Sequence, residues 1–118
     1  MAAKDVLGRR GERLAEDFLT GAGLVILDRN WRCPQGEIDL VARDGDELVF
    51  VEVKTRTSTA FGHPLEAITA LKLARLRRLA AAWCAEHRTR ARAIRLDAVA
   101  VLAPPSGEPV IEHLRRIF

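Results

Sequence analysis

Two runs of apolar residues, each interrupted by charged ones, flank a turn near the middle of the chain. The stretch 36–56 holds the pair Asp44-Gly45 between these runs, and an Asp-Gly pair in this setting strongly indicates a β-hairpin. Because side chains alternate along a strand, the second run begins apolar on both of its faces. One face holds Leu48 and Phe50, and the other holds Val49, Val51 and Val53. This pattern predicts a strand in the centre of a sheet.

The remaining pattern predicts two helices and three further strands. The predicted helices cover residues 4–20 and 65–87. The predicted strands cover 24–32, 94–102 and, as an edge strand, 110–118, and a polar loop suited to substrate contact covers 57–64. We therefore expect a single α/β domain over residues 1–118. Its sheet of about five strands would be flanked by the N-terminal helix and a long basic helix.

Each predicted helix holds residues that its own pattern does not explain. Gly8 and Gly11 lie inside the first helix, where each costs roughly 1 kcal/mol relative to Ala, so we expect a close approach of another backbone. In the second helix Lys72 falls in the middle of the apolar stripe. It either reaches past the sheet to solvent or contacts an anionic substrate near the hairpin's charged end. The stripe itself is formed by Ile68, Leu76, Leu79 and Trp83.

Charge is unevenly distributed along the chain. The net charge is only +3, but residues 54–95 hold ten Lys or Arg against Glu66 and Glu86, which favours a polyanionic partner such as nucleic acid. The sequence has neither the apolar run of a secretory signal nor a run long enough to span a membrane, so we expect a cytoplasmic protein without membrane contact. Cys33 and Cys84 lack the spacing of a zinc site or disulfide framework and are expected to be free thiols.

Glu52 and Lys54 place charge at the end of the predicted central strand. Burying these groups even partly is costly unless a partner or a metal compensates. Asp39 falls directly opposite Glu52, on the same face, if the hairpin loop is 45–46 or 44–47. With a three-residue loop Asp39 would point to the other face. The register of the hairpin therefore decides whether two carboxylates and an ammonium group converge.

A cluster of Asp39, Glu52 and Lys54 would hold the groups that phosphodiester hydrolysis needs. Carboxylate oxygens suit Mg²⁺, with Mn²⁺ as a substitute, and such an ion lowers the pKa of a bound water and neutralises charge on the phosphate. Lys54 lies about 7 Å along the strand from Glu52, where it can position water or stabilise the transition state. The spacing Asp-x(12)-Glu-x-Lys is only moderately specific, and its place on a predicted hairpin strengthens it.

The hairpin resembles the PD-(D/E)XK motif of restriction-endonuclease-like nucleases. Asp39 matches its first acid, Glu52-Val53-Lys54 matches its second half, and Ile38 replaces its proline. From about Gly8 to Val101 the chain also resembles the bacterial YraN-like family, which is similar to archaeal Holliday-junction resolvases. The matching segments are Gly11-Glu12, Arg29-Asn30, 36–40, 50–56, Phe61-Gly62, Lys72 and Arg95-Leu96-Asp97. The resemblance implies a restriction-endonuclease-like domain, in which a central mixed β-sheet is flanked by helices.

The resemblance also implies roles for individual residues. The implied metal ligands are Glu12 from the first helix, Asp39 and Glu52. Lys54 would act at the scissile phosphate, and the implied contacts to the nucleic-acid backbone are Thr55, Arg56 and Lys72. Glu37 alternates to the same side as Asp39 and is an alternative ligand. Resolvase-like enzymes cut two strands in a coordinated way, which suggests a homodimer.

These features predict a Mg²⁺-dependent endonuclease that hydrolyses DNA phosphodiester bonds, with branched DNA such as a Holliday junction as a candidate substrate. Two other classes stay open. One is a nucleic-acid-binding module with weak or no catalysis, in which the acids form a structural ion-pair network. The other is a scaffold that docks onto another protein, because few aromatic residues are present to stack on bases.

Two further polar residues have open roles. Asp97 is interpreted as a structural ion-pair partner of Arg95 or Arg92, with membership of the polar cluster as the alternative. His63 in the polar loop is a candidate for acid or base chemistry, although a lone loop histidine is usually incidental.

Overall fold

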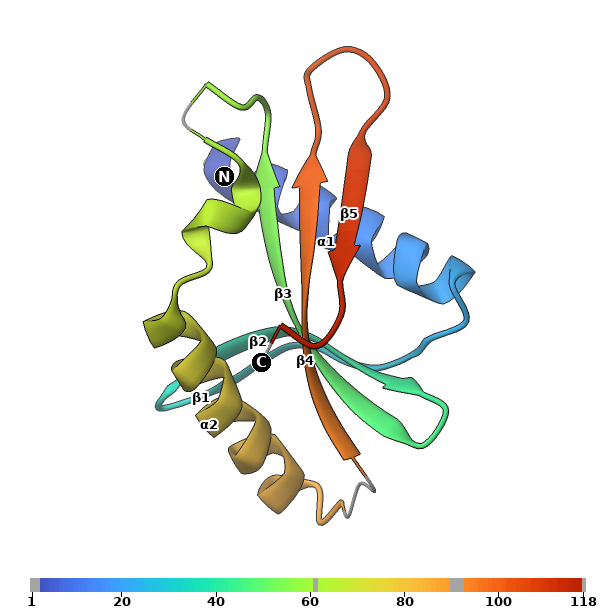
Figure 1. The fold of residues 1–118 in the computed structure, drawn as a ribbon, viewed down its shortest axis with the longest axis vertical. Coiled ribbons are helices and arrows are strands. Elements are labelled where there is room, and N and C mark those ends of the chain that lie inside the picture. Colours follow the sequence, from blue (N-terminus) through green and yellow to red (C-terminus); the bar gives the residue numbers. More distant parts are fainter. Residues whose placement is uncertain (1–2, 61, 90–92, 118) are drawn as a thin grey trace.

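Two α-helices and a five-stranded sheet make up the described part of the chain (Figure 1). The computed structural model describes residues 3–60, 62–89 and 93–117. In chain order the elements are α1 (Ala3–Gly21), β1 (Val25–Cys33), β2 (Gly36–Asp44), β3 (Glu47–Arg56), the 3₁₀ turn η1 (Pro64–Ala67), α2 (Ala70–Glu86), β4 (Ala93–Leu102) and β5 (Val110–Leu114). The predicted α/β fold with a mixed five-stranded sheet is confirmed.

The strands lie in the sheet in the order in which they follow in the chain, β1-β2-β3-β4-β5. The β3–β4 pair is parallel and the other three pairs are antiparallel. A parallel pair needs a crossover connection, which η1 and α2 supply. The predictions that β3 is central and that the tail pairs as an edge strand are both confirmed. The edge strand is shorter than predicted, since it ends at Leu114, and Phe118 lies outside the described residues.

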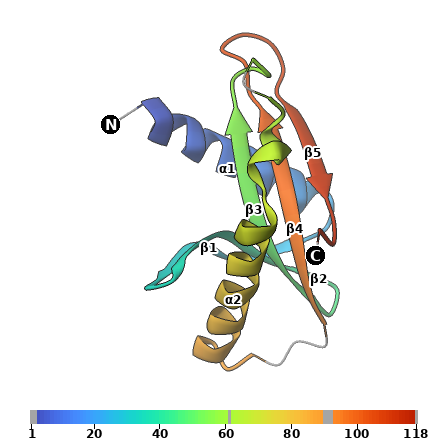
Figure 2. The same ribbon diagram turned by 60° about the vertical axis from the view of Figure 1, so that its left-hand side comes forward.

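The β2–β3 hairpin has a two-residue loop. Asp44 pairs with Glu47, and Gly45 has a φ of 61°, the left-handed conformation that the first position of a tight hairpin loop requires. The ladder then runs to Leu40 opposite Val51 and ends there, whereas β3 stays paired with β4 as far as Arg56. Beyond Leu40, β2 therefore leaves β3. In Figures 1 and 2 the β1–β2 pair is turned strongly away from β3 and β4.

Each helix covers one face of the sheet with its own apolar cluster. On the α1 side, Ala15 and Leu19 pack against a cluster that includes Val49, Val51 and Val53 of β3. On the α2 side, the cluster around Phe50 takes in Leu76, Leu79, Ala80 and Trp83 of the helix. The alternation predicted for β3 is therefore present on both faces. No helix in the described ranges is long and apolar enough to cross a membrane.

The predicted long helix over 65–87 is wrong at its N-terminal end. Residues Pro64–Ala67 form a 3₁₀ turn, and α2 begins only after Thr69. The Thr69 side chain accepts a hydrogen bond from the backbone N–H of Lys72 (3.2 Å) and so caps α2. The cap at Thr69 thus starts a new element within a stretch whose apolar periodicity is continuous. As a result Ile68 belongs to the connection and not to the helical stripe.

The two glycines of α1 differ in their surroundings. A Cβ atom on Gly11 would lie 1.8 Å from Thr55 Oγ1, whereas one on Gly8 would have no atom within 4 Å. A close approach is therefore present at Gly11, although a side chain makes it and not the predicted backbone, and the prediction is wrong for Gly8. The glycine at position 11 lets α1 lie directly on β3.

The buried charges of β4 form a fully paired network. Asp97 is 0% exposed and accepts two hydrogen bonds from Arg95, both 3.0 Å. It also pairs with His113 of β5 (2.7 Å) and accepts the backbone N–H of Arg116 (3.1 Å). Arg95 reaches on to Asp44 at the hairpin turn (2.9 Å). The structural interpretation of Asp97 is confirmed with Arg95 as its partner, and Arg92 lies outside the described residues.

Replacing Gly11 with Ala tests the seating of α1. The added methyl group collides with Thr55, which costs about 1–3 kcal/mol, whereas Ala in place of Gly contributes roughly 1 kcal/mol to the stability of a helix. We therefore expect Gly11→Ala to unfold at a lower urea concentration than Gly8→Ala. Gly8→Ala is the matched control and should be neutral or stabilising. Urea unfolding followed by tryptophan fluorescence measures both variants. Equal unfolding midpoints for Gly11→Ala and Gly8→Ala would contradict the close approach.

Replacing Asp97 with Ala tests the buried network. The change leaves the Arg95 guanidinium buried without its main partner, so we expect a loss of about 3–5 kcal/mol in the free energy of unfolding. Asp17→Ala, at an exposed position of α1, serves as the control. A loss below about 1 kcal/mol would show that Arg95 finds another partner or solvent.

Candidate functional site

At the point where β2 separates from β3, the side chain of Asp39 replaces a backbone hydrogen-bond partner of β3. Asp39 follows the last ladder pair, Leu40 opposite Val51. There Asp39 Oδ2 accepts the backbone N–H of Val53 at 2.8 Å. The register is the one in which Asp39 and Glu52 would oppose each other, so the convergence of these two acids predicted for a two-residue loop is present.

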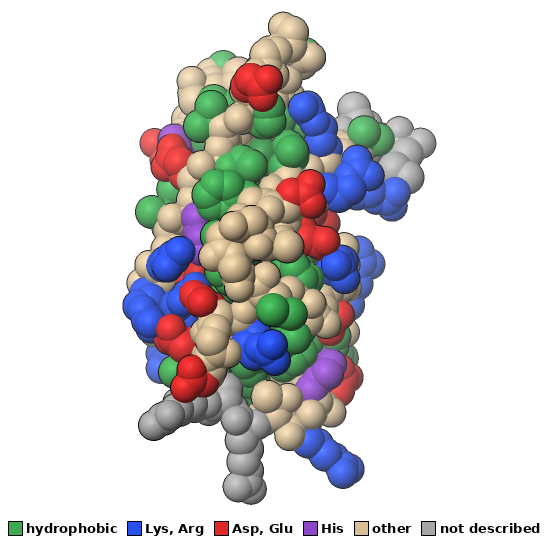
Figure 3. Space-filling model, turned by 90° about the vertical axis from the view of Figure 1, so that its right-hand side faces the viewer, with side chains coloured by type: hydrophobic (Ala, Val, Ile, Leu, Met, Phe, Trp, Pro, Cys, Tyr) green, Lys and Arg blue, Asp and Glu red, His purple; other side chains and the backbone are tan. Residues whose placement is uncertain are grey.

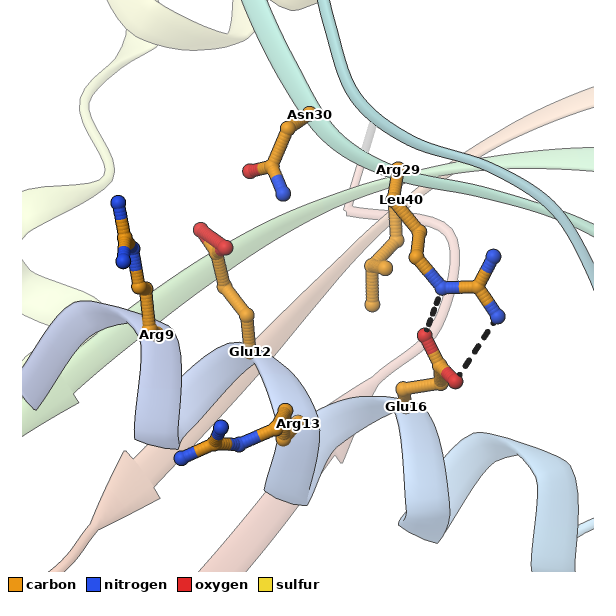
Figure 4. A pocket seen from close by; sticks show the side chains of 7 residues that line it. All are labelled: Arg9, Glu12, Arg13, Glu16, Arg29, Asn30 and Leu40. Carbon is orange, nitrogen blue, oxygen red and sulfur yellow. Dashed lines mark hydrogen bonds and ion pairs between the residues drawn. The ribbon is translucent and has the colours of Figure 1, made fainter. Parts of the chain in front are cut away.

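Three carboxylates from two elements meet at this point. Glu12 from α1 and Glu37 and Asp39 from β2 each offer an oxygen, and these oxygens lie within 4.8 Å of one another. Glu12 extends from α1 toward Asn30 of β1 (Figure 4). Its neighbour Gly11 is the residue that lets α1 contact β3, so the close packing of α1 also brings Glu12 to the sheet.

Burial and repulsion between carboxylates raise the pKa of two of these acids. Burial raises the pKa of Asp39 to about 7, and the charges of Glu52, Glu12 and Glu37 add to this effect against the opposing hydrogen bond from Val53. Burial and the charge of Glu37 likewise raise the pKa of Glu12. A bound cation would relieve this repulsion.

Glu52 and Lys54 form an ion pair on the other side of Asp39. Lys54 Nζ lies 3.2 Å from Glu52 Oε1, and the two side chains are only 24% and 22% exposed. Together with Asp39 they line a pocket between the sheet and α2. The other residues that line this pocket are Glu37, Lys72, Arg75, Leu76 and Leu79. Lys72 is exposed and faces this pocket, so the predicted position near the charged end of the hairpin is present.

A second hollow lies beside Glu12 on the α1 side (Figure 4). It is lined by Arg9, Glu12, Arg13, Glu16, Arg29, Asn30 and Leu40. Glu16 pairs with Arg29 through two hydrogen bonds, drawn as dashed lines in Figure 4. Arg9 and Arg13 are both exposed. The carboxylate cluster thus has basic side chains on both of its sides.

Three of the candidate residues do not line either of the pockets beside the cluster. Thr55 lies on the α1 side of β3, where its side chain faces Gly11, and Arg56 donates a hydrogen bond from Nη1 to the backbone oxygen of Thr55. His63 accepts the N–H of Leu65 through Nδ1 and lies 3.0 Å from Glu112 through Nε2. These contacts fix the 3₁₀ turn, so a structural role accounts for His63.

Comparison with known proteins places the chain in a family. The sequence profile of UPF0102, an uncharacterised protein family, matches residues 11–101. A UPF0102 protein of Beutenbergia cavernae is 62% identical over 117 residues, with 99% of each chain covered. Another, of Arthrobacter sp., is 59% identical over 117 residues, again with 99% of each chain covered. The chain belongs to the UPF0102 family. This is the membership that the YraN-like resemblance predicted, and it is confirmed.

The region that the UPF0102 profile matches contains the whole carboxylate cluster. It begins at Gly11, next to Glu12, and ends at Val101 in β4. It therefore includes the Glu52–Lys54 pair and Lys72 but not β5. A UPF0102 protein of Frankia alni matches over 118 residues at 55% identity, with 100% of this chain and 98% of the relative covered.

Three residues of the site were not singled out for it by the sequence pattern. Asn30 contacts two of the carboxylates, Arg32 donates a hydrogen bond from Nε to Glu37 Oε2 (2.9 Å), and Arg75 lines the pocket of Lys54. Asn30 and Arg32 lie two residues apart on β1. The register of β1 with β2 pairs Arg32 with Glu37. That cross-strand pairing was the signal available for Arg32. For Asn30, the only signal in the sequence was its place in the motif Arg29-Asn30.

The raised pKa of Asp39 predicts a pH dependence of stability in the metal-free protein. Because its pKa rises from 3.8 to about 7 on folding, the folded state holds a proton that the unfolded state releases. The stabilisation is complete below pH 3.8 and is lost as the pH rises through about 7. We therefore expect wild type to lose stability relative to Asp39→Asn between pH 4 and pH 8, roughly the span of these pKa values.

Urea unfolding in the presence of a chelator measures this difference. The asparagine variant keeps an acceptor for the Val53 N–H but cannot ionise. Asp17→Asn, at an exposed position, is the control for the exchange of an aspartate for an asparagine. Parallel pH profiles for wild type and Asp39→Asn would show that Asp39 ionises normally in the folded protein.

Proposed function

We propose that this protein is a metal-dependent nuclease that hydrolyses phosphodiester bonds in nucleic acid, with DNA as the favoured substrate. The observation that carries the proposal is the meeting of Glu12, Glu37 and Asp39 beside the Glu52–Lys54 ion pair. Carboxylates and an ammonium group at one point are the groups that phosphodiester hydrolysis uses. The restriction-endonuclease-like relationship of the fold is part of this proposal.

The donor set fits a hard divalent cation. Mg²⁺ binds oxygen ligands at 2.0–2.1 Å, so two ligands on one ion lie at most about 4.2 Å apart. The candidate oxygens lie within 4.8 Å of one another, and small rotations of Glu12 or Glu37 would bring them onto one ion. Residues Glu12, Glu37 and Asp39 would hold Mg²⁺ or Mn²⁺, with Glu52 as a further ligand if Lys54 releases it. The ion would supply an activated water and neutralise charge on the phosphate.

The basic side chains of the pocket have separate roles in this proposal. Lys54 is paired with Glu52 and only 24% exposed, and it lines the same pocket as Glu37 and Asp39. There it can stabilise the negative charge that develops on the phosphate. Lys72 and Arg75 lie on α2 at the rim of the same pocket and can contact neighbouring phosphates.

The charge distribution supports an interface at the pocket between the sheet and α2. On the face that looks away from α2, acidic and basic side chains are interleaved (Figure 3). Interleaved charges give no single-sign field to attract a polyanion. The pocket with Lys54, Lys72 and Arg75 adjoins the carboxylates and is therefore the better candidate for phosphate contacts. Coordinated cutting of two strands of branched DNA would further require a homodimer.

Cleavage of a substrate panel tests the proposal. Labelled single-stranded, duplex, flap and four-way-junction DNA, with matching RNA, are incubated with Mg²⁺ or Mn²⁺ and purified protein. We expect cleavage by wild type, its loss in Glu52→Gln, and wild-type rates in Glu108→Gln, an exposed carboxylate in the β4–β5 connection. Salt-sensitive binding without cleavage would identify a binding module, and absence of both would favour a protein-docking scaffold.

Two lysine variants separate catalysis from binding. Lys54→Ala should lower kcat by about 10²-fold or more with little change in substrate affinity, because its charge acts at the transition state. Lys72→Ala should weaken binding and reduce the salt slope by about one unit, because it removes one phosphate contact. Single-turnover cleavage and fluorescence anisotropy over a salt series measure these effects. Equal kcat in Lys54→Ala and wild type would remove Lys54 from the site.

A further inference from the structure

Asn30 lies between two carboxylates that come from different elements. It belongs to β1, whereas Glu12 comes from α1 and Glu37 from β2. In Figure 4 the Asn30 side chain projects toward the Glu12 carboxylate from the opposite wall of the hollow. Its backbone has a φ of 50°, in the left-handed region that Asn enters more readily than most residues.

The Asn30 amide bridges these carboxylates. Of its two orientations, only the one with the nitrogen toward the acids is favourable, since the other sets its oxygen against theirs. In that orientation the nitrogen donates to Glu12 Oε1 at 2.9 Å and to Glu37 Oε1 at 3.0 Å. Both amide hydrogens are therefore used. The second oxygen of Glu37 accepts from Arg32 Nε at 2.9 Å, so β1 holds both oxygens of this carboxylate.

Two like charges held this close repel each other, and long Glu side chains have other rotamers available. A donor that bonds to both carboxylates opposes that repulsion and restricts both side chains at once. Ligands that are already oriented lose less conformational entropy when a cation binds. Hydrogen bonds to ligating carboxylates commonly tune metal sites in this way.

We propose that Asn30 is a positioning residue, which holds Glu12 and Glu37 in the arrangement that binds the divalent cation. This inference rests on the proposed function, because it assigns Asn30 to the same metal site. It adds a residue that contacts neither the cation nor the substrate. A purely structural alternative is that Asn occupies position 30 only because the backbone there is left-handed.

The variant Asn30→Gly separates these two explanations. Glycine adopts a positive φ freely, so the backbone of β1 is kept while the bridging amide is lost. The matched control is Arg88→Gly, because Arg88 has a φ of 49° and an exposed side chain far along the chain from the carboxylates. Calorimetric titration with Mn²⁺ measures the affinity of wild type and both variants. Asp39→Asn shows whether the Mn²⁺ site is the carboxylate cluster.

We expect Asn30→Gly to bind Mn²⁺ about 10–100-fold more weakly than wild type, the range typical of lost hydrogen bonds to metal ligands. Arg88→Gly should bind as wild type does. Thermal unfolding in chelator should show Asn30→Gly folded, so that a loss of affinity cannot reflect unfolding.

Wild-type Mn²⁺ affinity in Asn30→Gly would overturn the inference and leave the proposed function intact. Equal losses in Asn30→Gly and Arg88→Gly would also overturn it, because the effect would then come from the backbone. Mn²⁺ binding that depends on Asn30, in a protein that cleaves none of the substrates, would support the inference and count against the nuclease. A wild type that binds no Mn²⁺ would overturn both.

Discussion

The separation of β2 from β3 beyond the Leu40–Val51 pair is the constraint on which the candidate site depends. Up to that pair the two strands bury apolar residues on both faces, and β3 continues alone beside β4. The backbone N–H of Val53 has lost its partner strand and is satisfied by Asp39 instead. A carboxylate is thereby held at the end of the core, where the two strands part and where both helices can reach it.

The surroundings of Asp97 and Asp39 shift the pKa values of these two aspartates in opposite directions. Burial alone would raise the pKa of Asp97, but hydrogen bonds from His113, Arg95 and Arg116 bring it below its ordinary value. Asp39 has one hydrogen bond and three carboxylate neighbours, and its pKa rises to about 7. The network around Asp97 stabilises the fold with paired charge. The cluster around Asp39 has charge left to be compensated, which distinguishes a candidate site from a structural ion pair.

Helices α1 and α2 approach the site from opposite faces of the sheet, each through a local feature. Gly11 removes the side chain that would collide with Thr55, so α1 packs closely and Glu12 reaches the cluster. The cap at Thr69 starts α2 after the 3₁₀ turn, which places Lys72 and Arg75 at the rim of the pocket. Packing and function are therefore linked, because the residues that seat the helices also orient the polar groups.

The sequence by itself determined the elements, because alternation and helical periodicity are local properties that neighbouring residues express directly. It also identified Glu12, Asp39, Glu52 and Lys54 as candidates, since these charges interrupt otherwise apolar patterns. Only the tertiary structure decided the hairpin register, the start of α2 and the bridging position of Asn30. These depend on contacts between elements far apart in the chain. A two-residue loop can be told from a longer one, a capping threonine from a residue inside a helix, and a left-handed asparagine from an ordinary strand residue only when the opposite strand and both helices are in place.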